Sequence, residues 1–137
     1  FGLRGNMVEE SLNLELLADA TVAGLIGTRL YPYLVPQDAE LPAIAYQRIS
    51  GPREYSHDGP SGQARALIQL TIEAATYAAA KSTAAAVRSA LSGFRGILGG
   101  AGGTAVGGIF IENEIDGYSE IGEARTVRLD VSIQYGE

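Results

Sequence analysis

The chain has 137 residues, of which 46% are hydrophobic and 19% are charged, so it is expected to form a compact domain with a packed core rather than a disordered segment. Its formal net charge is −6, Lys81 is the only lysine and the arginines are spread along the chain, which excludes the basic face that stable DNA or RNA binding needs. The absence of cysteine excludes disulfides, thiolate chemistry and metals bound through sulfur.

The N-terminal region shows no basic segment followed by an apolar stretch, so no signal peptide is expected. No apolar run approaches the roughly 18 residues that a membrane helix needs, so a membrane partner is not expected. Residues 1–6 (Phe1 to Asn6) precede the only methionine, Met7, and are predicted to be a remnant of the expression sequence. Residues 7–137 are then expected to form a single domain.

The domain is predicted to begin with a helical region. Residues 7–27 read as helix, with Asp19 as the cap of a short second segment that ends at Gly27. One apolar face of this region is formed by Leu12, Leu16 and Leu17. Residues 29–42 contain Pro32, Pro36 and Pro42 and predict an extended loop.

Two strands are predicted next. Residues 43–50 read as the first strand, and residues 51–63 as a loop dense in turn residues. Residues 64–75 alternate cleanly and predict a strand with one buried face. That buried face consists of Ala66, Ile68, Leu70, Ile72 and Ala74.

The second half of the chain predicts one long helix and two further strands. Thr76 is expected to cap an alanine-rich helix that Gly93 closes. The apolar stripe of this helix is Ala80, Ala84, Val87 and Leu91. The glycine-rich segment 93–108 predicts a flexible loop, and residues 109–116 a third strand.

The last strand is the most regular one in the sequence. Residues 124–135 place one set of side chains inward, and Thr126, Arg128, Asp130, Ser132 and Gln134 outward. The inward set is Val127, Leu129, Val131, Ile133 and Tyr135. The predicted order is helix, strand, strand, helix, strand, strand, with each strand pair an antiparallel hairpin. This is an α+β domain whose mainly antiparallel sheet packs with the N-terminal helix and the long alanine-rich helix.

Three consecutive residues, Ser56, His57 and Asp58, have the side-chain types of a hydrolase triad. Catalytic triads are assembled in space on a rigid scaffold, and neighbours in sequence rarely point at one another. No Gly-x-Ser-x-Gly elbow occurs in the sequence. With Gly59 and Pro60 following directly, the segment is interpreted as a turn rather than a catalytic site.

Residues 100–105, GAGGTA, match the glycine fingerprint of dinucleotide-binding proteins. That fingerprint works where the glycines leave a strand and open a helix whose N-terminus holds the phosphates. Here the run follows a helix and enters a strand. It is therefore interpreted as a loop that becomes ordered on assembly, and no cofactor is expected.

An acidic stretch follows the glycine run. Glu112, Glu114, Asp116, Gly117 and Glu123 have the spacing of an EF-hand calcium loop. The first position is a glutamate instead of the usual aspartate, and the flanking segments read as strands. An exposed acidic row on one strand face is the favoured interpretation, so no metal site is expected.

Several segments in register carry a resemblance to a known family. They are GTRLYPYLVPQDAELPAIAYQRIS, SHDGPSGQARALIQLTIEA, TYAAAKSTAAAVRSAL and DGYSEIGEARTVRLDVSIQY. In order and spacing the chain resembles the tail-terminator, or tail-completion, proteins of long non-contractile-tailed bacteriophages and gene-transfer particles. The resemblance runs from about Met7 to Tyr135.

The resemblance implies a structural protein rather than an enzyme, with a fold similar to that of the tail-tube subunit. Such proteins form a six-membered ring on the last ring of the tube, stop its polymerisation and present a docking surface to the head connector. They assemble in the cytoplasm of the bacterial host and then belong to the tail of the particle. DNA is expected to pass through the lumen without specific binding. Whether the free protein is a monomer is left open.

On this interpretation the turn at Tyr55, His57 and Asp58 is the tip of the first hairpin and an assembly contact. Arg48, Arg53 and Arg65 lie on or beside that hairpin. We expect them to pair with acidic residues of a neighbouring subunit, namely Glu112, Glu114 or Asp116. Ordinary surface charges, each worth little, are the alternative interpretation.

Two other functions remain open at this stage. A head–tail joining or adaptor subunit of the neck would keep the structural class and change the position. A small-ligand or nucleotide-binding domain that uses the glycine run would belong to a different class.

Overall fold

The structure is a computed structural model that describes residues 8–50, 53–56, 59–100, 103–119 and 124–136, with side chains over 8–49, 64–100, 103–119 and 124–135. Parts of several sequence predictions fall outside these residues. They are the expression remnant at residues 1–6, the contacts predicted for His57 and Asp58, Ala101 and Gly102 of the glycine run, and Glu123 of the acidic stretch.

Three helices are present in the described residues. The predicted caps Asp19, Gly27 and Thr76 are confirmed, whereas the C-cap of the long helix is Ser92 and not the predicted Gly93, whose N–H donates to Ile109 O. The N-terminal region forms α1 (Val8–Ala18) and α2 (Ala20–Ile26), because the Asp19 carboxylate accepts hydrogen bonds of 3.0 Å from the N–H groups of Thr21 and Val22. The long helix is α3 (Tyr77–Leu91), and Thr76 Oγ1 accepts a 3.1 Å bond from the N–H of Ala79. None of these helices is long and apolar enough to span a membrane.

Seven strands in the described residues form one mixed sheet in the order β1-β2-β4-β7-β6-β5, with β3 paired to β4. Only β1 and β2 pair in parallel, and the remaining pairs are antiparallel. The strands are β1 (Leu30–Pro32), β2 (Ala43–Ser50), β3 (Arg53–Ser56), β4 (Gly59–Ala74), β5 (Gly96–Leu98), β6 (Thr104–Ser119) and β7 (Ala124–Gly136). The predicted α+β class and both predicted hairpins, β2–β4 and β6–β7, are confirmed.

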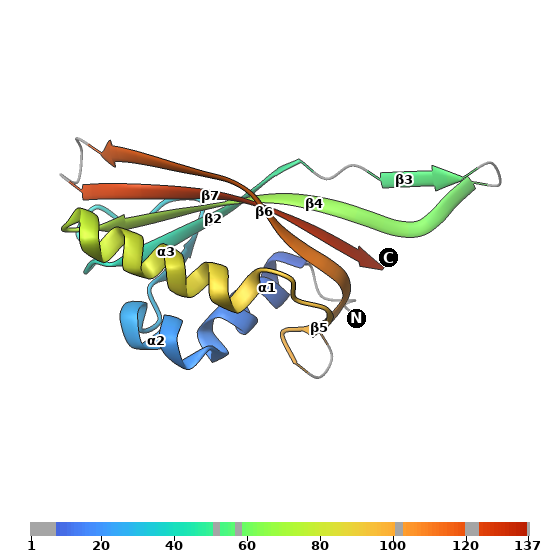
Figure 1. Cartoon of the computed structure of the whole chain (residues 1–137), viewed down its shortest axis with the longest axis horizontal. Coiled ribbons are helices and arrows are strands. Elements are labelled where there is room, and N and C mark those ends of the chain that lie inside the picture. The colour runs from blue at the N-terminus through green and yellow to red at the C-terminus, as the bar shows by residue number, and fades with distance from the viewer. Residues whose placement is uncertain (1–7, 51–52, 57–58, 101–102, 120–123, 137) are drawn as a thin grey trace.

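The core lies between one face of this sheet and the three helices, which all cover that face (Figure 1). The predicted inward sets of β4 and of the α3 stripe are fully buried, and Ile68 packs there with Leu129 of β7. Alanine at the centre of the helix stripe, as at Ala84, lets α3 lie close to the strands. The alternation in the sequence therefore correctly predicts which face of the sheet the helices cover.

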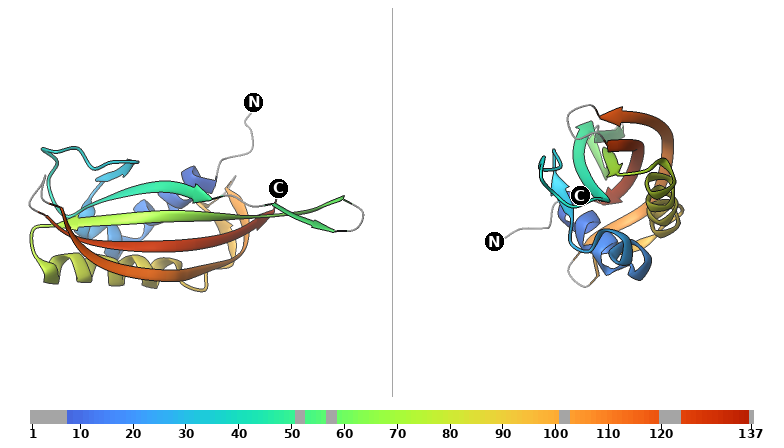
Figure 2. Two further views of the ribbon diagram at one scale, coloured as in Figure 1. Left: turned by 90° about the horizontal axis from the view of Figure 1, so that it is seen from above. Right: turned by 90° about the vertical axis from the view of Figure 1, so that its left-hand side faces the viewer.

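Part of the sheet extends beyond the core as an arm, which consists of β3 and the first part of β4. Figure 2 shows it projecting from one end of the body, beside the C-terminal end of β7. Ser56 pairs with Gly59 at its tip, and Arg53 pairs with Ala64 at its base. The predicted loop over residues 51–63 is thus largely strand. Turn residues such as Pro60 are tolerated there because both strands of a two-stranded ribbon are edge strands. A proline, which has no N–H group, then leaves no partner strand without a hydrogen bond.

Two other predicted loops also contain strands. In the proline-rich loop, β1 pairs with β2, and the N–H of Ile44 donates to Arg29 O at 3.0 Å. Pro32 is acceptable there because it ends a short edge strand. In the glycine-rich segment, β5 pairs with the start of β6 after a reversal at Gly99 and Gly100, whose φ angles are 87° and 82°.

One predicted outward residue of β7 is buried. Ser132 is only 3% exposed, although it lies on the sheet face away from the helices. Its cross-strand neighbour Phe110 covers this region, since a Cβ at Gly108 would meet the Phe110 ring at 3.0 Å. Neighbouring side chains on the same face therefore bury a position that alternation alone predicts to be exposed.

Candidate assembly surfaces

Arg48 was predicted to reach a neighbouring subunit, and the structure gives it a partner in its own chain. It lies opposite Ile68 on the helix side of the sheet, where α1 begins. Its Nε and Nη2 donate to the two carboxylate oxygens of Glu9 at 3.1 and 3.0 Å. Burial acts to lower the pKa of Arg48, but hydrogen bonds with Glu9 and Tyr135 outweigh it and raise that pKa. This two-point contact ties α1 to β2.

Glu114 and Asp116 also have partners in their own chain, all of them on α3. Lys81 Nζ and Arg88 Nη1 donate to Glu114. Asp116 accepts bonds from Lys81 at 3.1 Å and from the Tyr77 hydroxyl at 3.0 Å. These hydrogen bonds, first of all those from Lys81, lower the pKa of both carboxyl groups and raise that of Lys81. The network fastens α3 to β6.

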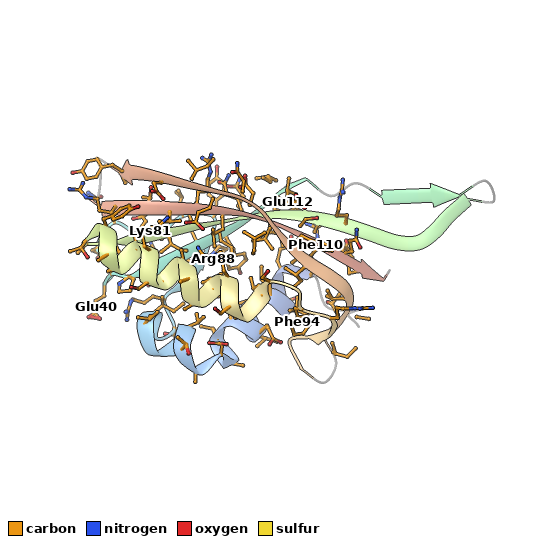
Figure 3. The ribbon with its side chains drawn as sticks, in the orientation of Figure 1. Glu40, Lys81, Arg88, Phe94, Phe110 and Glu112 are labelled. Carbon is orange, nitrogen blue, oxygen red and sulfur yellow. The ribbon has the colours of Figure 1, made fainter. Side chains whose placement is uncertain are left out.

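The three acidic residues do not share one face, as strict alternation predicted. A β-bulge lies at Glu112, because Ile111 pairs with Val131 while Asn113 already pairs with Asp130. The extra residue turns Glu114 toward the helices and leaves Glu112 exposed. In Figure 3 Glu112 lies across the sheet from Lys81 and Arg88 of α3. The prediction of a single acidic row is therefore wrong.

The remaining predicted contacts are in the arm or on the sheet face away from the helices, the outer face. Arg53 and Tyr55 are on β3, where only the backbone is described. Arg65 is exposed on the outer face opposite Gln134, and no described residue pairs with it or with Glu112. The interface role predicted for these residues stays a prediction.

The outer face also has one polar group that sequence patterns did not reveal. Asp130 Oδ1 is buried and has no hydrogen-bond partner among the described residues. Asp130 lies between Gln69 of β4 and Asn113 of β6. A buried carboxylate oxygen without a donor is costly, so this face is a candidate for contact with another molecule.

The glycine run has a structural role in the described residues. It connects β5 to β6, and no helix follows it. The N–H of Gly103 donates to Gly100 O at 2.9 Å, and a Cβ at Gly103 would meet Leu98 O at 1.9 Å. A tight strand reversal does not offer the helix N-terminus that a dinucleotide fingerprint requires. Among the described residues no group of three His, Cys, Asp or Glu side chains is placed to hold a metal ion.

An exposed apolar pair at the end of the molecule opposite the arm was not predicted from the sequence. There the β1–β2 connection presents Tyr33 and Leu34, which are 64% and 69% exposed. Two consecutive large apolar residues between prolines were a signal that this loop is not merely a spacer. Exposed apolar side chains at one end of the molecule are suitable for a protein contact.

The comparisons with known proteins decide the family. Residues 11–136 match the family model described as tail completion protein gp17. The chain belongs to the tail completion protein gp17 family. This membership confirms the family resemblance drawn from the sequence and makes the protein a structural component of a phage-type tail.

A solved structure shares the fold of this tail completion protein. It is a chain from a structure titled "Virion of native gene transfer agent (GTA) particle", with a TM-score of 0.73, 24% identity, and coverage of 95% of this chain and 98% of that one. No curated protein sequence matches the chain. Membership of a structural tail family implies a non-enzymatic role for the tail completion protein.

Proposed function

We propose that this tail completion protein assembles as a six-membered ring on the end of the tail tube. The ring stops polymerisation of the tube and presents a docking surface for the head connector. Its partners are further copies of itself, the tube protein and the connector protein, and it acts in the host cytoplasm during assembly. Family membership supports the position in the tail, and the arm supports assembly.

The arm is the main observation that supports assembly as a ring. It extends past the body of the sheet, where it projects away from the helix layer of its own chain (Figure 2). Two-stranded ribbons are marginal in water on their own, so such an arm gains stability when a neighbour covers it. A contact from the arm of one copy to the body of the next is heterologous and can close by rotation.

We assign the interface first to the residues that have no partner in their own chain. Arg65 and Glu112 are exposed and unpaired within the described residues. Arg53 and Tyr55 belong to the arm, and His57 and Asp58, which lie outside the described residues, keep the assembly role predicted from the sequence. Arg48, Glu114 and Asp116 would have to exchange their internal partners, so we expect them to contribute less.

Net charge supports free passage of DNA through such a ring. Six copies at −6 each give a total of about −36. Repulsion between like charges would keep DNA from adhering to the lumen. A map of the assembled ring with an arginine-lined lumen would contradict this part of the proposal.

Electron microscopy of particles from a producer strain that lacks the gene tests the function. Overlong or headless tails would support a terminator that stops tube growth. Tails of normal length beside detached filled heads would place the protein at the head side of the joint instead. Intact, infectious particles would reject both positions.

An arm-shortened variant tests the ring directly. Replacing residues 54–63 by Asn-Gly joins Arg53 to Ala64, which already pair, through a two-residue turn that suits a hairpin. The described core residues lie in the body of the protein, so this variant should keep its melting temperature. We expect it to fail to restore tail termination in the deletion strain. Full restoration would show that the arm is dispensable.

A further inference from the structure

A pocket of about 350 Å³ lies at the end of the molecule opposite the arm, where Figure 3 labels Glu40. The β1–β2 connection forms most of its wall, and the ends of β4 and β6 complete it. Its lining is Leu34, Val35, Pro36, Gln37, Ala39, Leu41, Glu73 and Ser119. Apolar walls with one charged group are typical of a site that holds an apolar side chain and one ion-pairing group.

Glu73 is the charged group of this pocket. It lies in β4 opposite Ala43 and Thr126, and it is partly buried. No described residue forms a hydrogen bond or ion pair with it, and burial raises the pKa of its carboxyl group. A carboxylate that has lost water without gaining a cation would be stabilised by an arginine or lysine from outside.

The loop beside the pocket holds its apolar side chains outward. Tyr33 has a φ angle of 74°, which is uncommon for a residue with a side chain. Its N–H donates to Tyr46 O at 2.8 Å, and that of Leu34 donates to Pro32 O at 2.8 Å, so the conformation is fixed. Strained positions of this kind gather at binding sites.

The other end of the same chain presents a complementary group. Arg95 is exposed and has no partner among the described residues, and Ile97 of β5 is 51% exposed. The 15 residues of α3 separate this segment from Glu73, a length of about 22 Å at 1.5 Å per residue. The two groups therefore cannot meet within one molecule, but they can meet between two.

We propose that this pocket receives the exposed Arg95–Ile97 segment of a second copy. The Arg95 guanidinium pairs with Glu73, and Ile97 enters the apolar part formed by Val35 and Leu41. Because the two surfaces lie at opposite ends, the contact runs head to tail, the kind of heterologous contact that a closed ring requires. The proposal rests on the ring proposed above and specifies one of its contacts.

A charge exchange tests the ion pair. Glu73→Arg and Arg95→Glu are each expected to lower the yield of complete tails in the deletion strain about tenfold, because each places like charges in contact. The double variant should recover most of the yield. Glu10→Arg, a matched reversal at an exposed glutamate of α1 with no described partner, should change little. Failure of the double variant to recover, with both single variants folded, would overturn the contact.

Cross-linking tests the position, and the chain suits it because it has no cysteine. Val35→Cys and Ile97→Cys variants, mixed in assembled tails and oxidised, should form a disulfide between two copies. Rings without this cross-link would overturn the proposed contact and leave the terminator function intact. Normal tails in the deletion strain would overturn both the terminator function and the proposed contact. The failure of the contact alone is therefore distinguishable from the failure of the function.

Discussion

Ser11 Oγ and Thr104 Oγ1 lie 2.7 Å apart, although 93 residues separate them in the chain. Both residues are buried, and they join α1 to the first residue of β6. Each hydroxyl satisfies the other in a region otherwise filled by apolar side chains. The pair therefore helps to fix where the first helix docks on the far strand of the sheet.

The first prediction separates the loss of this bond from the cost of leaving one hydroxyl unpaired. Ser11→Ala should lower the free energy of unfolding by about 1–3 kcal/mol, because Thr104 then stays buried without a partner. The double variant Ser11→Ala with Thr104→Val should be destabilised less than the single variant. Urea unfolding measures both, and additive losses in the double variant would contradict the prediction.

The second prediction concerns the close approach of the glycine reversal to the same helix. Gly99 has a φ angle of 87°, and a Cβ there would meet Ser11 Cα and O at 3.0 Å. Gly99→Ala should therefore destabilise the protein by more than about 1 kcal/mol. Gly24→Ala in α2 is the matched control, because a Cβ there meets nothing within 4 Å. Thermal unfolding should show the control unchanged or stabilised by about 0.5–1 kcal/mol.

The third prediction tests how tightly α3 packs on the sheet. Ala84 is fully buried in the helix stripe, whereas Ala78, near the start of the same helix, is exposed. Ala84→Leu should lower stability by about 1–3 kcal/mol, since the added atoms have no room. Ala78→Leu makes the same chemical change at the surface and should be nearly neutral. Equal unfolding midpoints for both variants would show that the interface is loose.

The fourth prediction concerns pH. Hydrogen bonding to Lys81 holds the pKa of Glu114 below its ordinary value of 4.5, so the folded state binds fewer protons than the unfolded state near that pH. The stabilisation is present above about pH 4.5 and is lost as pH falls through the folded-state pKa. Glu114→Gln should melt several degrees below the wild type at pH 6.

The difference in melting temperature between these two proteins should then shrink as the pH falls below 4.5. Comparing them removes the effect of Glu73, whose raised pKa acts in the opposite direction because its charged form is disfavoured by burial. A difference that stays constant as the pH falls through the acid range below 4.5 would show that the Glu114 contacts do not contribute to stability.

The elements with strong periodicity were predictable from sequence, and those set by pairing were not. Alternation identified the buried sets of β4 and β7, and helix-capping residues identified α2 and α3, because both signals are local. The pairing of β1 with β2 depends on residues more than ten positions apart. Its three residues include Pro32, which locally argues for a loop.

The candidate contacts divide in the same way into features with a local sequence signal and features set by the fold. Sequence correctly indicated charged residues near the first hairpin and in β6, but it could not indicate their partners. Arg48 meets Glu9 only because α1 docks beside β2, and Glu114 meets Lys81 only because α3 lies along β6. The pocket around Glu73 has no local signature at all, since its walls come from three separate parts of the chain.

The register of β6 shifts twice along its length, once between Val106 and Gly108 and once at the Glu112 bulge. Between the two shifts, odd-numbered residues such as Ile109 face the helices; outside them, even-numbered residues such as Val106 and Glu114 do. Deleting Glu112 would remove the second shift and exchange the two faces of the strand from Asn113 to Ser119. Ile115 would then face α3, and Lys81 and Arg88 would lose their carboxylates. A single-residue deletion in β6 would therefore remove the charged contacts between this strand and α3.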